Sequence, residues 1–213
     1  MKYLGRLTTT AIIAFVHTSY LIYYYFRDGI VDTADLLGYP LLLFLAWWAG
    51  LQYDRAKYYS EKDSLTNLYN RRFVTASFDK MGALANRNGA KLYVLVMDCD
   101  NFKEINDRYS HHTGDKVLRA ISGLLLRHTR QSDVVARWGG DEFVVLGQYK
   151  DNEGLQAMLL RLQDECARLS EQYGMHIAIS IGSSLYPDDS RDLYGLIKTA
   201  DRHMYQAKAA KRE

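Results

Sequence analysis

Apolar residues are concentrated in two long stretches near the start of the chain. From Leu7 to Phe26, and again from Leu36 to Tyr53, the sequence contains no Asp, Glu, Lys or Arg. Each stretch is close to the roughly 20 residues that an α-helix needs to cross a bilayer. The short connection between them is rich in aspartate. This pattern predicts two transmembrane helices that form a membrane anchor over residues 1–53.

Basic residues flank this anchor on its outer sides and predict its orientation. Lys2 and Arg6 precede the first stretch, whereas Arg55 and Lys57 follow the second. The positive-inside rule therefore predicts a multi-pass protein of the inner (cytoplasmic) membrane, with both termini and the remaining domain in the cytoplasm. A soluble helical hairpin is an alternative, because the first stretch contains three consecutive threonines and a histidine. A cleaved signal peptide is less favoured, since no small-residue cleavage site separates the two stretches.

The rest of the chain shows the periodicities of both helices and strands. Residues 54–62 are polar and lack Gly and Pro, so we expect them to continue the second membrane helix as a helical stalk. Beyond the stalk, segments with helical spacing alternate with short runs rich in Val and Ile. This alternation predicts an α/β domain over residues 63–213, with a sheet covered by helices. The predicted helices span 71–86, 114–128, 155–173 and 193–210, and the predicted strands span 92–97, 134–138, 143–146 and 176–185.

Composition excludes some classes of function. The 27 Lys and Arg residues nearly balance the 25 Asp and Glu residues. Proteins that bind duplex nucleic acid usually carry a basic surface, so we expect no nucleic-acid partner. The two cysteines, Cys99 and Cys166, are far apart and form no CxxC motif, which favours a reducing compartment and argues against zinc.

Acidic residues lie where predicted strands end or begin. Asp98 follows the first strand of the domain, and Asp141 and Glu142 follow the Gly139-Gly140 pair between two short strands. Carboxylates at strand ends often bind ligands in open α/β sheets, and paired glycines permit a two-residue turn that a phosphate can approach. If the strands are neighbours, the three acids converge on a site suited to Mg²⁺ and to phosphoryl or nucleotidyl transfer. The alternative is an ordinary hairpin whose acids are solvated.

Five sequence motifs surround these acids in a fixed order. They are DSLTNLYNRR at Asp63–Arg72, MDCDNFKEINDRYSHHTGD at Met97–Asp115, RWGGDEF at Arg137–Phe143, SIGSSLYP at Ser180–Pro187 and ADRHMYQAK at Ala200–Lys208. With them, essentially all of residues 63–212 resembles the GGDEF family, the diguanylate cyclases. Five ordered motifs are far more specific than one pentapeptide. The resemblance implies a palm-like nucleotidyl cyclase fold with a central, mostly antiparallel sheet covered by helices.

The resemblance also implies an activity and a metal site. The domain would condense two GTP molecules into cyclic di-GMP and release two pyrophosphates, as a homodimer in which each domain presents one GTP. Two Mg²⁺ ions per active site are implied, with Mn²⁺ as an alternative. Asp98, Asp141 and the backbone carbonyl of Cys99 would bind one ion, and Glu142 would reach the second. Asp141 would also activate the attacking 3′-hydroxyl, with Glu142 as the second catalytic acid.

Further residues are assigned to the nucleotide and the product by the same resemblance. Asn106 and Asp115 match the pair that reads guanine, whose N1–H and 2-amino group a carboxylate can accept together. Arg130 and Asp133 form an Arg-x-x-Asp motif that resembles an inhibitory site for cyclic di-GMP, with Arg161 as a helper. The alternative for that motif is a weak exposed ion pair at a helix end. The other implied substrate contacts are Phe102, Lys103, Gly139, Gly140, Lys208 and Arg212.

Two segments depart from the family pattern. Ser110-His111 replaces the usual Gly-His, which predicts an altered turn, and residues 211–213 replace the closing Gly-Arg-Asn, which changes the last expected phosphate contact. Because the acids and the guanine pair are intact, we expect an active cyclase. The alternative is a catalytically silent receptor that binds GTP or cyclic di-GMP and signals through protein partners. A cyclase with another base preference is less favoured because of Asp115.

Overall fold

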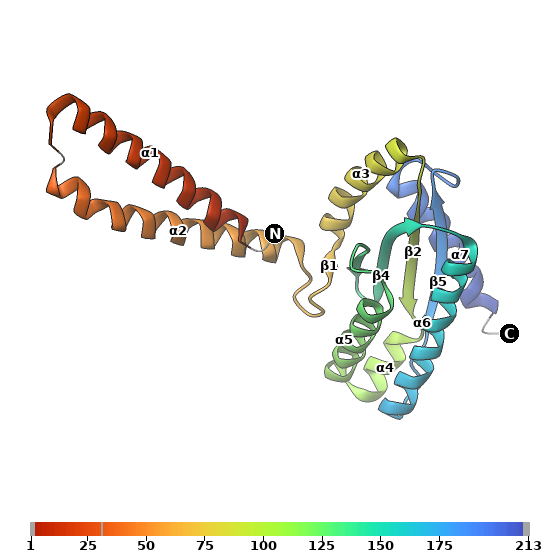
Figure 1. The fold of residues 1–213 in the computed structure, drawn as a ribbon. Helices are drawn as coiled ribbons and strands as arrows, with labels where there is room; N and C mark the ends of the chain where they lie inside the picture. Colours follow the sequence, from red (N-terminus) through yellow and green to blue (C-terminus); the bar gives the residue numbers. More distant parts are fainter. Residues whose placement is uncertain (1–2, 31, 211–213) are drawn as a thin grey trace. The chain divides into compact units, whose positions relative to one another are not determined.

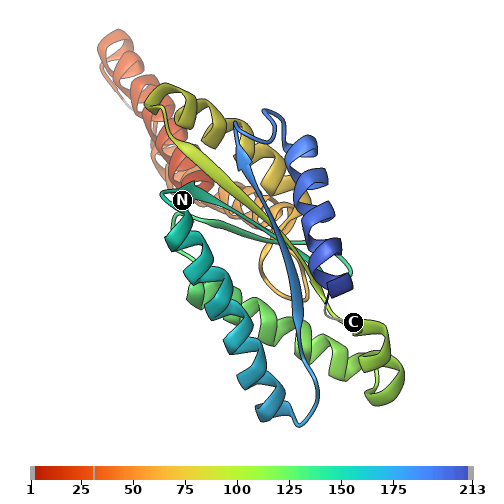
Figure 2. The same cartoon turned by 90° about the vertical axis from the view of Figure 1, so that its right-hand side faces the viewer.

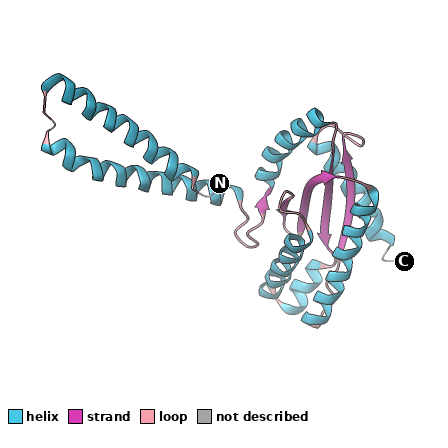
Figure 3. Ribbon diagram, viewed as in Figure 1, coloured by secondary structure: helices cyan, strands magenta, loops and turns pink. Residues whose placement is uncertain are grey.

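A computed structural model describes residues 3–30 and 32–210 (Figure 1). The chain divides into two compact units, Met1–Ser60 and Glu61–Glu213. Within the described residues, the first unit is helical and the strands belong to the second (Figure 3).

The first unit is an antiparallel pair of helices, α1 (Leu4–Asp28) and α2 (Thr33–Glu61). The two helices approach closely at Gly50, where an added Cβ would lie 2.6 Å from the Cα of Arg6. Asp54 on α2 accepts a hydrogen bond from the backbone N–H of Arg6 at 3.2 Å, and its carboxylate forms an ion pair with the Arg6 side chain at 3.2 Å. The start of α1, where backbone N–H groups lack helical partners, is therefore held by α2.

Among the described residues, α2 is the one helix that is long and apolar enough to cross a membrane, by length and composition. The polar side chains of α1 lower its hydropathy, and some of them bond within the hairpin. The Thr9 hydroxyl donates to the carbonyl of Ala46 at 2.8 Å, and Nε2 of His17 lies 3.3 Å from the carbonyl oxygen of Asp35. The membrane span predicted over Leu7–Phe26, within α1, stays a prediction.

The second unit contains a five-stranded sheet with the order β1-β3-β4-β2-β5. β1 and β3 are parallel, and the other neighbouring strands are antiparallel, so the predicted α/β fold with a mostly antiparallel sheet is confirmed. The strands are β1 (Tyr69–Asn70), β2 (Lys91–Cys99), β3 (Val134–Gly139), β4 (Glu142–Tyr149) and β5 (Ile179–Tyr186). The helices are α3 (Arg71–Asn88), α4 (Phe102–Tyr109), α5 (His111–His128), α6 (Asn152–Tyr173) and α7 (Leu193–Ala210).

Strand β2 separates two hydrophobic layers. Its side chains alternate between the faces of the sheet, as strand geometry requires. Leu95 and Met97 join one core cluster with residues of α5 and α6, whereas Val94 and Val96 join the other with residues of α3 and α7. Figure 2 shows these helix pairs on opposite faces of the sheet. Because both faces are covered, β2 is apolar almost throughout and acquires a carboxylate only near its end.

The hairpin between β3 and β4 differs from the predicted one. Gly139 is the last residue of β3 and pairs with Glu142, so the turn residues are Gly140 and Asp141 rather than the two glycines. Gly140 has φ +46°, a value that L side chains rarely adopt, whereas no positive φ occurs at Gly139. A shift in register after Arg137 produces the difference. Asp141 therefore lies at the corner of the hairpin.

Candidate active site

Sheet register brings the three predicted acids together. In the pairing of β2 with β4, Asp98 lies directly opposite Glu142. The backbone N–H of Cys99 donates to the carbonyl oxygen of Asp141 at 3.2 Å, which fixes the hairpin corner against the end of β2. All three acids are half-buried. The condition set by the sequence, that the two strands be neighbours, is therefore met.

The pKa values of Asp141 and Glu142 are both raised. Burial is the main cause that raises the pKa of Asp141, and the charge of Asp98 raises it further. The pKa of Glu142 is raised by burial first and then by Asp98, Asp141 and Asp201. Like charges in a partly desolvated site disfavour ionisation, and a cation bound between them relieves the repulsion. The electrostatics of this corner therefore favour a positively charged ligand.

Lys208 of α7 already supplies one positive charge. Its ammonium group forms an ion pair with Asp98, and its Nζ lies 3.9 Å from Oδ1 of Asp100. Burial works to lower the pKa of Lys208, but the hydrogen bond and the charges of these aspartates raise it overall. The sequence assigned Lys208 to the triphosphate. In the structure it neutralises the acid at the end of β2.

Asp100 is a site residue that the sequence analysis missed. It is buried, and one of its carboxylate oxygens accepts a hydrogen bond from the Ser180 hydroxyl on β5 at 2.7 Å. Its backbone N–H donates to the carbonyl of Ala178 at 2.9 Å. The repeated acid in Asp98-Cys99-Asp100 was the available signal. Asp100 orients the chain immediately after β2 and shares Lys208 with Asp98.

The acids fit a magnesium site of the open kind. Among the described residues, no group of three or more His, Cys, Asp or Glu side chains is arranged to hold a metal by itself. Mg²⁺ is commonly held by one or two carboxylates together with water and substrate phosphates, so a closed cage is not required. Asp98, Asp141 and Glu142 offer only oxygen ligands, which Mg²⁺ and Mn²⁺ prefer.

Arg137 ties the hairpin corner to a distant loop. Its Nε donates to the carbonyl oxygen of Gly140 at 2.8 Å, and its Nη1 lies 3.2 Å from Oδ1 of Asp63. Oδ1 of Asp63 also accepts from the backbone N–H of Thr66 at 2.9 Å. Burial works to raise the pKa of Asp63, but the hydrogen bonds from Thr66 and Arg137 lower it. No local pattern predicts this contact, because the two residues are 74 positions apart.

The predicted guanine-binding residues lie on the α4–α5 hairpin. Asn106 and Asp115 are both half-buried. An added Cβ on Gly114 would lie 2.0 Å from Oδ1 of Asn106 and 3.1 Å from Cζ of Phe102, so this glycine lets the two helices bring these side chains together. Ser110, between the helices, has φ +113°, a region where glycine is favoured. The replacement of glycine there places an L residue in an uncommon conformation.

Two of the predicted phosphate contacts are not brought into this site by the structure. Lys103 is exposed on α4, and among the described residues it forms no hydrogen bond or ion pair with these acids. Arg212 lies outside the described residues. Gly139 and Gly140 are exposed at the hairpin corner, where a phosphate can reach their backbone.

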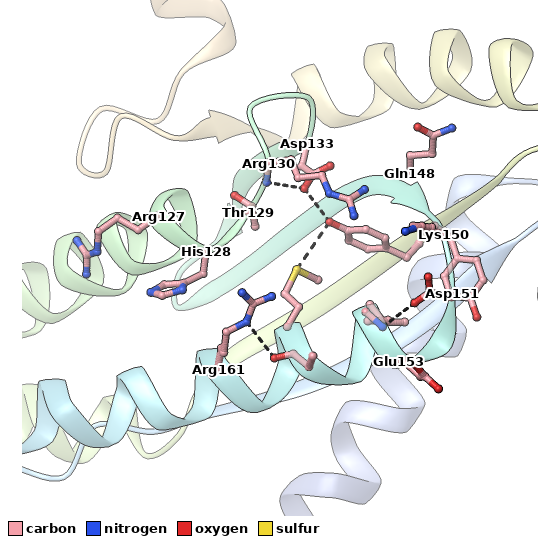
Figure 4. A pocket seen from close by; sticks show the side chains of 16 residues that line it. Arg127, His128, Thr129, Arg130, Asp133, Gln148, Lys150, Asp151, Glu153 and Arg161 are labelled. Atoms are coloured by element: carbon pink, nitrogen blue, oxygen red, sulfur yellow. Dashed lines mark hydrogen bonds between the residues drawn. The ribbon is translucent and has the colours of Figure 1, made fainter.

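A separate pocket of about 640 Å³ contains the Arg-x-x-Asp motif (Figure 4). Arg130 and Asp133 occupy the turn that leads from α5 to β3, and Arg161 of α6 lies across the pocket from them. Asp133 is only 8% exposed, and its Oδ2 accepts from the backbone N–H of Arg130 at 2.8 Å. The motif is therefore not an exposed ion pair at a helix end. Other basic residues that line the pocket are Arg127, His128 and Lys150.

Comparison with known sequences supplies the decisive observation. Residues 60–213 match the sequence model of the GGDEF domain, described as diguanylate cyclase. The chain belongs to the GGDEF family. The matched residues include Asp98, Asp141 and Glu142.

Two relatives of the GGDEF chain are named as diguanylate cyclases. The chain is 44% identical over 153 residues to diguanylate cyclase DosC of Escherichia coli (strain K12). The aligned region covers 68% of this chain and 32% of DosC. The chain is 37% identical over 169 residues to diguanylate cyclase TpbB of Pseudomonas aeruginosa (strain PAO1). The aligned region covers 76% of this chain and 39% of TpbB. The chain thus spans about a third of the length of these relatives.

Solved structures show the same fold. The coiled coil and GGDEF domain of DgcB from Caulobacter crescentus, in complex with c-di-GMP, gives a TM-score of 0.68 at 25% identity and covers 75% of this chain and 86% of that one. The GGDEF domain of TpbB (YfiN) from Pseudomonas aeruginosa gives a TM-score of 0.65 at 37% identity, with coverage of 70% and 89%.

Proposed function

We propose that this chain is a Mg²⁺-dependent diguanylate cyclase that condenses two GTP molecules into cyclic di-GMP and releases two pyrophosphates. One observation carries the proposal: Asp98 lies opposite Glu142 on neighbouring strands, with Asp141 at the adjoining corner. The relatives DosC and TpbB, both named as diguanylate cyclases, support the same activity.

Residues at the hairpin corner would hold the metal and move the proton. Asp98, Asp141 and the carbonyl of Cys99 would bind one Mg²⁺ ion, and Glu142 would reach a second, with Mn²⁺ as the alternative ion. A bound ion stabilises the charge that develops on the attacking and leaving oxygens. A carboxylate oxygen of Asp141 accepts the proton of the GTP 3′-hydroxyl. The hydrogen bond from the backbone N–H of Cys99 to the backbone carbonyl of Asp141 fixes the main chain that carries this carboxylate.

Helices α4 and α5 would select the base. Asp115 accepts from N1–H and the 2-amino group of guanine, and Asn106 contacts the same edge. Adenine lacks these donors and would leave the half-buried acceptors unpaired, which is the physical basis of discrimination. Phe102 packs beside the nucleotide. The phosphates are met by the backbone of Gly139 and Gly140 and by Lys103, Lys208 and Arg212.

Two copies of the chain are required by this chemistry. Each site presents one GTP, and the 3′-hydroxyl of one nucleotide attacks the α-phosphate of the other. We therefore propose a homodimer with the two sites facing each other. Residues 1–53 anchor the chain in the inner membrane with the catalytic domain in the cytoplasm, a proposal supported by the apolar length of α2.

The pocket that contains Arg130, Asp133 and Arg161 is the proposed site of feedback inhibition by cyclic di-GMP. Its basic side chains suit the two phosphates of the product, and its buried carboxylate suits a guanine edge. The complex of the DgcB GGDEF structure with c-di-GMP supports a binding site for the product in this family.

The test of synthesis uses the purified full chain in detergent with GTP and Mg²⁺, and product is quantified by chromatography. Asp141→Ala should lower turnover by at least about 1,000-fold, since it removes both a metal ligand and the proton acceptor. Its stability should change by no more than about 0.5 kcal/mol, because the turn carboxylate is half-exposed. Asp164→Ala, an exposed acid on α6, is the matched control.

The same experiment separates the cyclase from the silent receptor. A dimeric wild-type preparation that binds GTP but forms no cyclic dinucleotide would reject the cyclase and favour the receptor. Equal turnover by Asp141→Ala and the wild type would reject the role given to Asp141.

A further inference from the structure

A phenol from strand β2 holds the acid of the proposed product pocket. Oη of Tyr93 donates a hydrogen bond to Oδ2 of Asp133 at 2.9 Å. This carboxylate oxygen also accepts a hydrogen bond from the backbone N–H of Arg130 (Figure 4). Tyr93 is 5% exposed. Burial, followed by the charge of Asp133, raises the pKa of Tyr93 far above its usual range, so the phenol stays protonated and remains a donor.

The other oxygen of this carboxylate has no donor. Oδ1 of Asp133 is buried and lacks a hydrogen-bond partner among the residues that the structure describes. A buried acceptor without a partner is costly, because it has lost its water without gaining a bond. Oδ1 is covered in the structure, so a ligand donor reaches it only after a movement of its surroundings, and it then gains a hydrogen bond to an oxygen that is already dehydrated. One oxygen of the carboxylate is thus held by two donors, and the other is an acceptor that a ligand can satisfy.

Gly147 on β4 makes room for this arrangement. An added Cβ at that position would lie 2.5 Å from Oδ1 of Asp133 and 2.5 Å from Cζ of Tyr93. Any side chain there would displace the phenol, the carboxylate or both. Tyr93 is confined from another direction by Met158 of α6, whose sulfur lies 3.9 Å from the phenol oxygen. The orientation of the carboxylate is therefore set by residues from three separate elements.

We propose that Tyr93 is a positioning residue that fixes Asp133 for recognition of the guanine 2-amino group of a bound cyclic dinucleotide. The inference rests on the proposed product pocket. The basic side chains contact phosphates and bind any cyclic dinucleotide, whereas the fixed carboxylate distinguishes between bases. Loss of the phenol hydroxyl therefore reduces selectivity more than it reduces general affinity.

The test measures binding of two ligands to the full chain in detergent by calorimetry. One ligand is cyclic di-GMP, and the other is cyclic di-IMP, whose base keeps N1–H but lacks the 2-amino group. The wild type should prefer cyclic di-GMP. Tyr93→Phe should weaken cyclic di-GMP about 10-fold and cyclic di-IMP much less, so that the preference largely disappears. Tyr149→Phe is the control, because it removes another phenol hydroxyl that lines the same pocket. Within the described part of the chain, Tyr149 does not donate to Asp133, so this variant should keep the preference for cyclic di-GMP.

Arg130→Ala distinguishes a failure of this inference from a failure of the pocket itself. If Arg130→Ala binds both ligands as the wild type does, the pocket is not the product site. If Arg130→Ala weakens both ligands but Tyr93→Phe keeps the wild-type preference, Tyr93 has no positioning role. An equal loss of both ligands in Tyr93→Phe indicates general loosening and also overturns the inference, as does a wild type without preference.

A second variant reaches the same carboxylate from the opposite side. Gly147→Ala leaves Tyr93 intact but forces Asp133 or the phenol to move. It should lose the preference for cyclic di-GMP in the same way, with a folded state verified by near-UV circular dichroism. A folded Gly147→Ala protein with undiminished preference contradicts the proposal even if Tyr93→Phe cannot be purified.

Discussion

Asp98 lies on strand β2 and Asp133 is hydrogen-bonded to it, but the electrostatic surroundings of the two carboxylates differ. At the end of β2, Asp98 lies beside Asp141 and Glu142, whose pKa values are raised by burial and by neighbouring acids. Near the start of the strand, Tyr93 and a backbone N–H donate to Asp133, and several basic side chains line the pocket together with Asp151 and Glu153. We propose that the first site, with its excess negative charge, binds a cation. The second site, whose acid is already held by donors, is the proposed site of an anionic ligand.

Lys208 is the basic residue through which the charge of the first site can be changed. Lys208→Met should lower turnover by roughly 100-fold, because the ammonium group that meets the triphosphate is lost. Without nucleotide, the same variant should bind Mn²⁺ more tightly than the wild type, since Lys208 no longer competes for Asp98. Turnover and Mn²⁺ titration followed by electron paramagnetic resonance measure the two effects.

Lys198→Met is the control for this change, since Lys198 is exposed on the same helix. It should affect neither quantity. Weaker Mn²⁺ binding by Lys208→Met would mean that the lysine supports the metal site and does not compete with the ion.

Arg130 offers the corresponding change at the second site. Arg130→Ala should raise the concentration of cyclic di-GMP needed for half-inhibition by about 10-fold, because a charge-assisted contact to the product is removed. Initial rates at increasing product concentration give the value. Arg168→Ala, an exposed arginine on α6, should inhibit as the wild type does. Unchanged inhibition in Arg130→Ala would leave the second site without its proposed ligand.

Local patterns predicted much of the framework but little of the contact network. The helix at 193–210 was predicted to the residue, because a long periodic segment carries a strong signal. Helix α4 was missed, since its eight residues contain few apolar positions, and β1 has only two residues. The meeting of Asp98 with Glu142 could be stated only as a condition, because strand order is a long-range property.

Burial of individual polar groups was the hardest feature to foresee. The sequence left open an exposed ion pair as the alternative for Asp133, and no local pattern predicted its hydrogen bond from Tyr93, which is 40 positions away. The sequence also placed the hairpin turn one residue early, because a shift in register after Arg137 has no composition signal. The sequence motifs identified the acids of both candidate sites. The fold determines which of these acids accept hydrogen bonds from protein donors.

Asp63 permits a test, outside the two sites, of the distinction between acids held by hydrogen-bond donors and acids that repel one another. Like Asp133, it is held by donors, and the hydrogen bonds from Thr66 and Arg137 lower its pKa in the folded state. A lowered folded-state pKa stabilises the protein above the unfolded value of about 3.9, and this contribution is lost as the pH falls through the folded value. Asp63→Asn should therefore destabilise the full chain by about 1 kcal/mol at pH 6 and progressively less below pH 4. Urea unfolding in detergent at several pH values measures the difference, and in an Arg137→Gln background it should shrink at every pH. A difference that grows as the pH falls would place Asp63 with the mutually repelling acids instead.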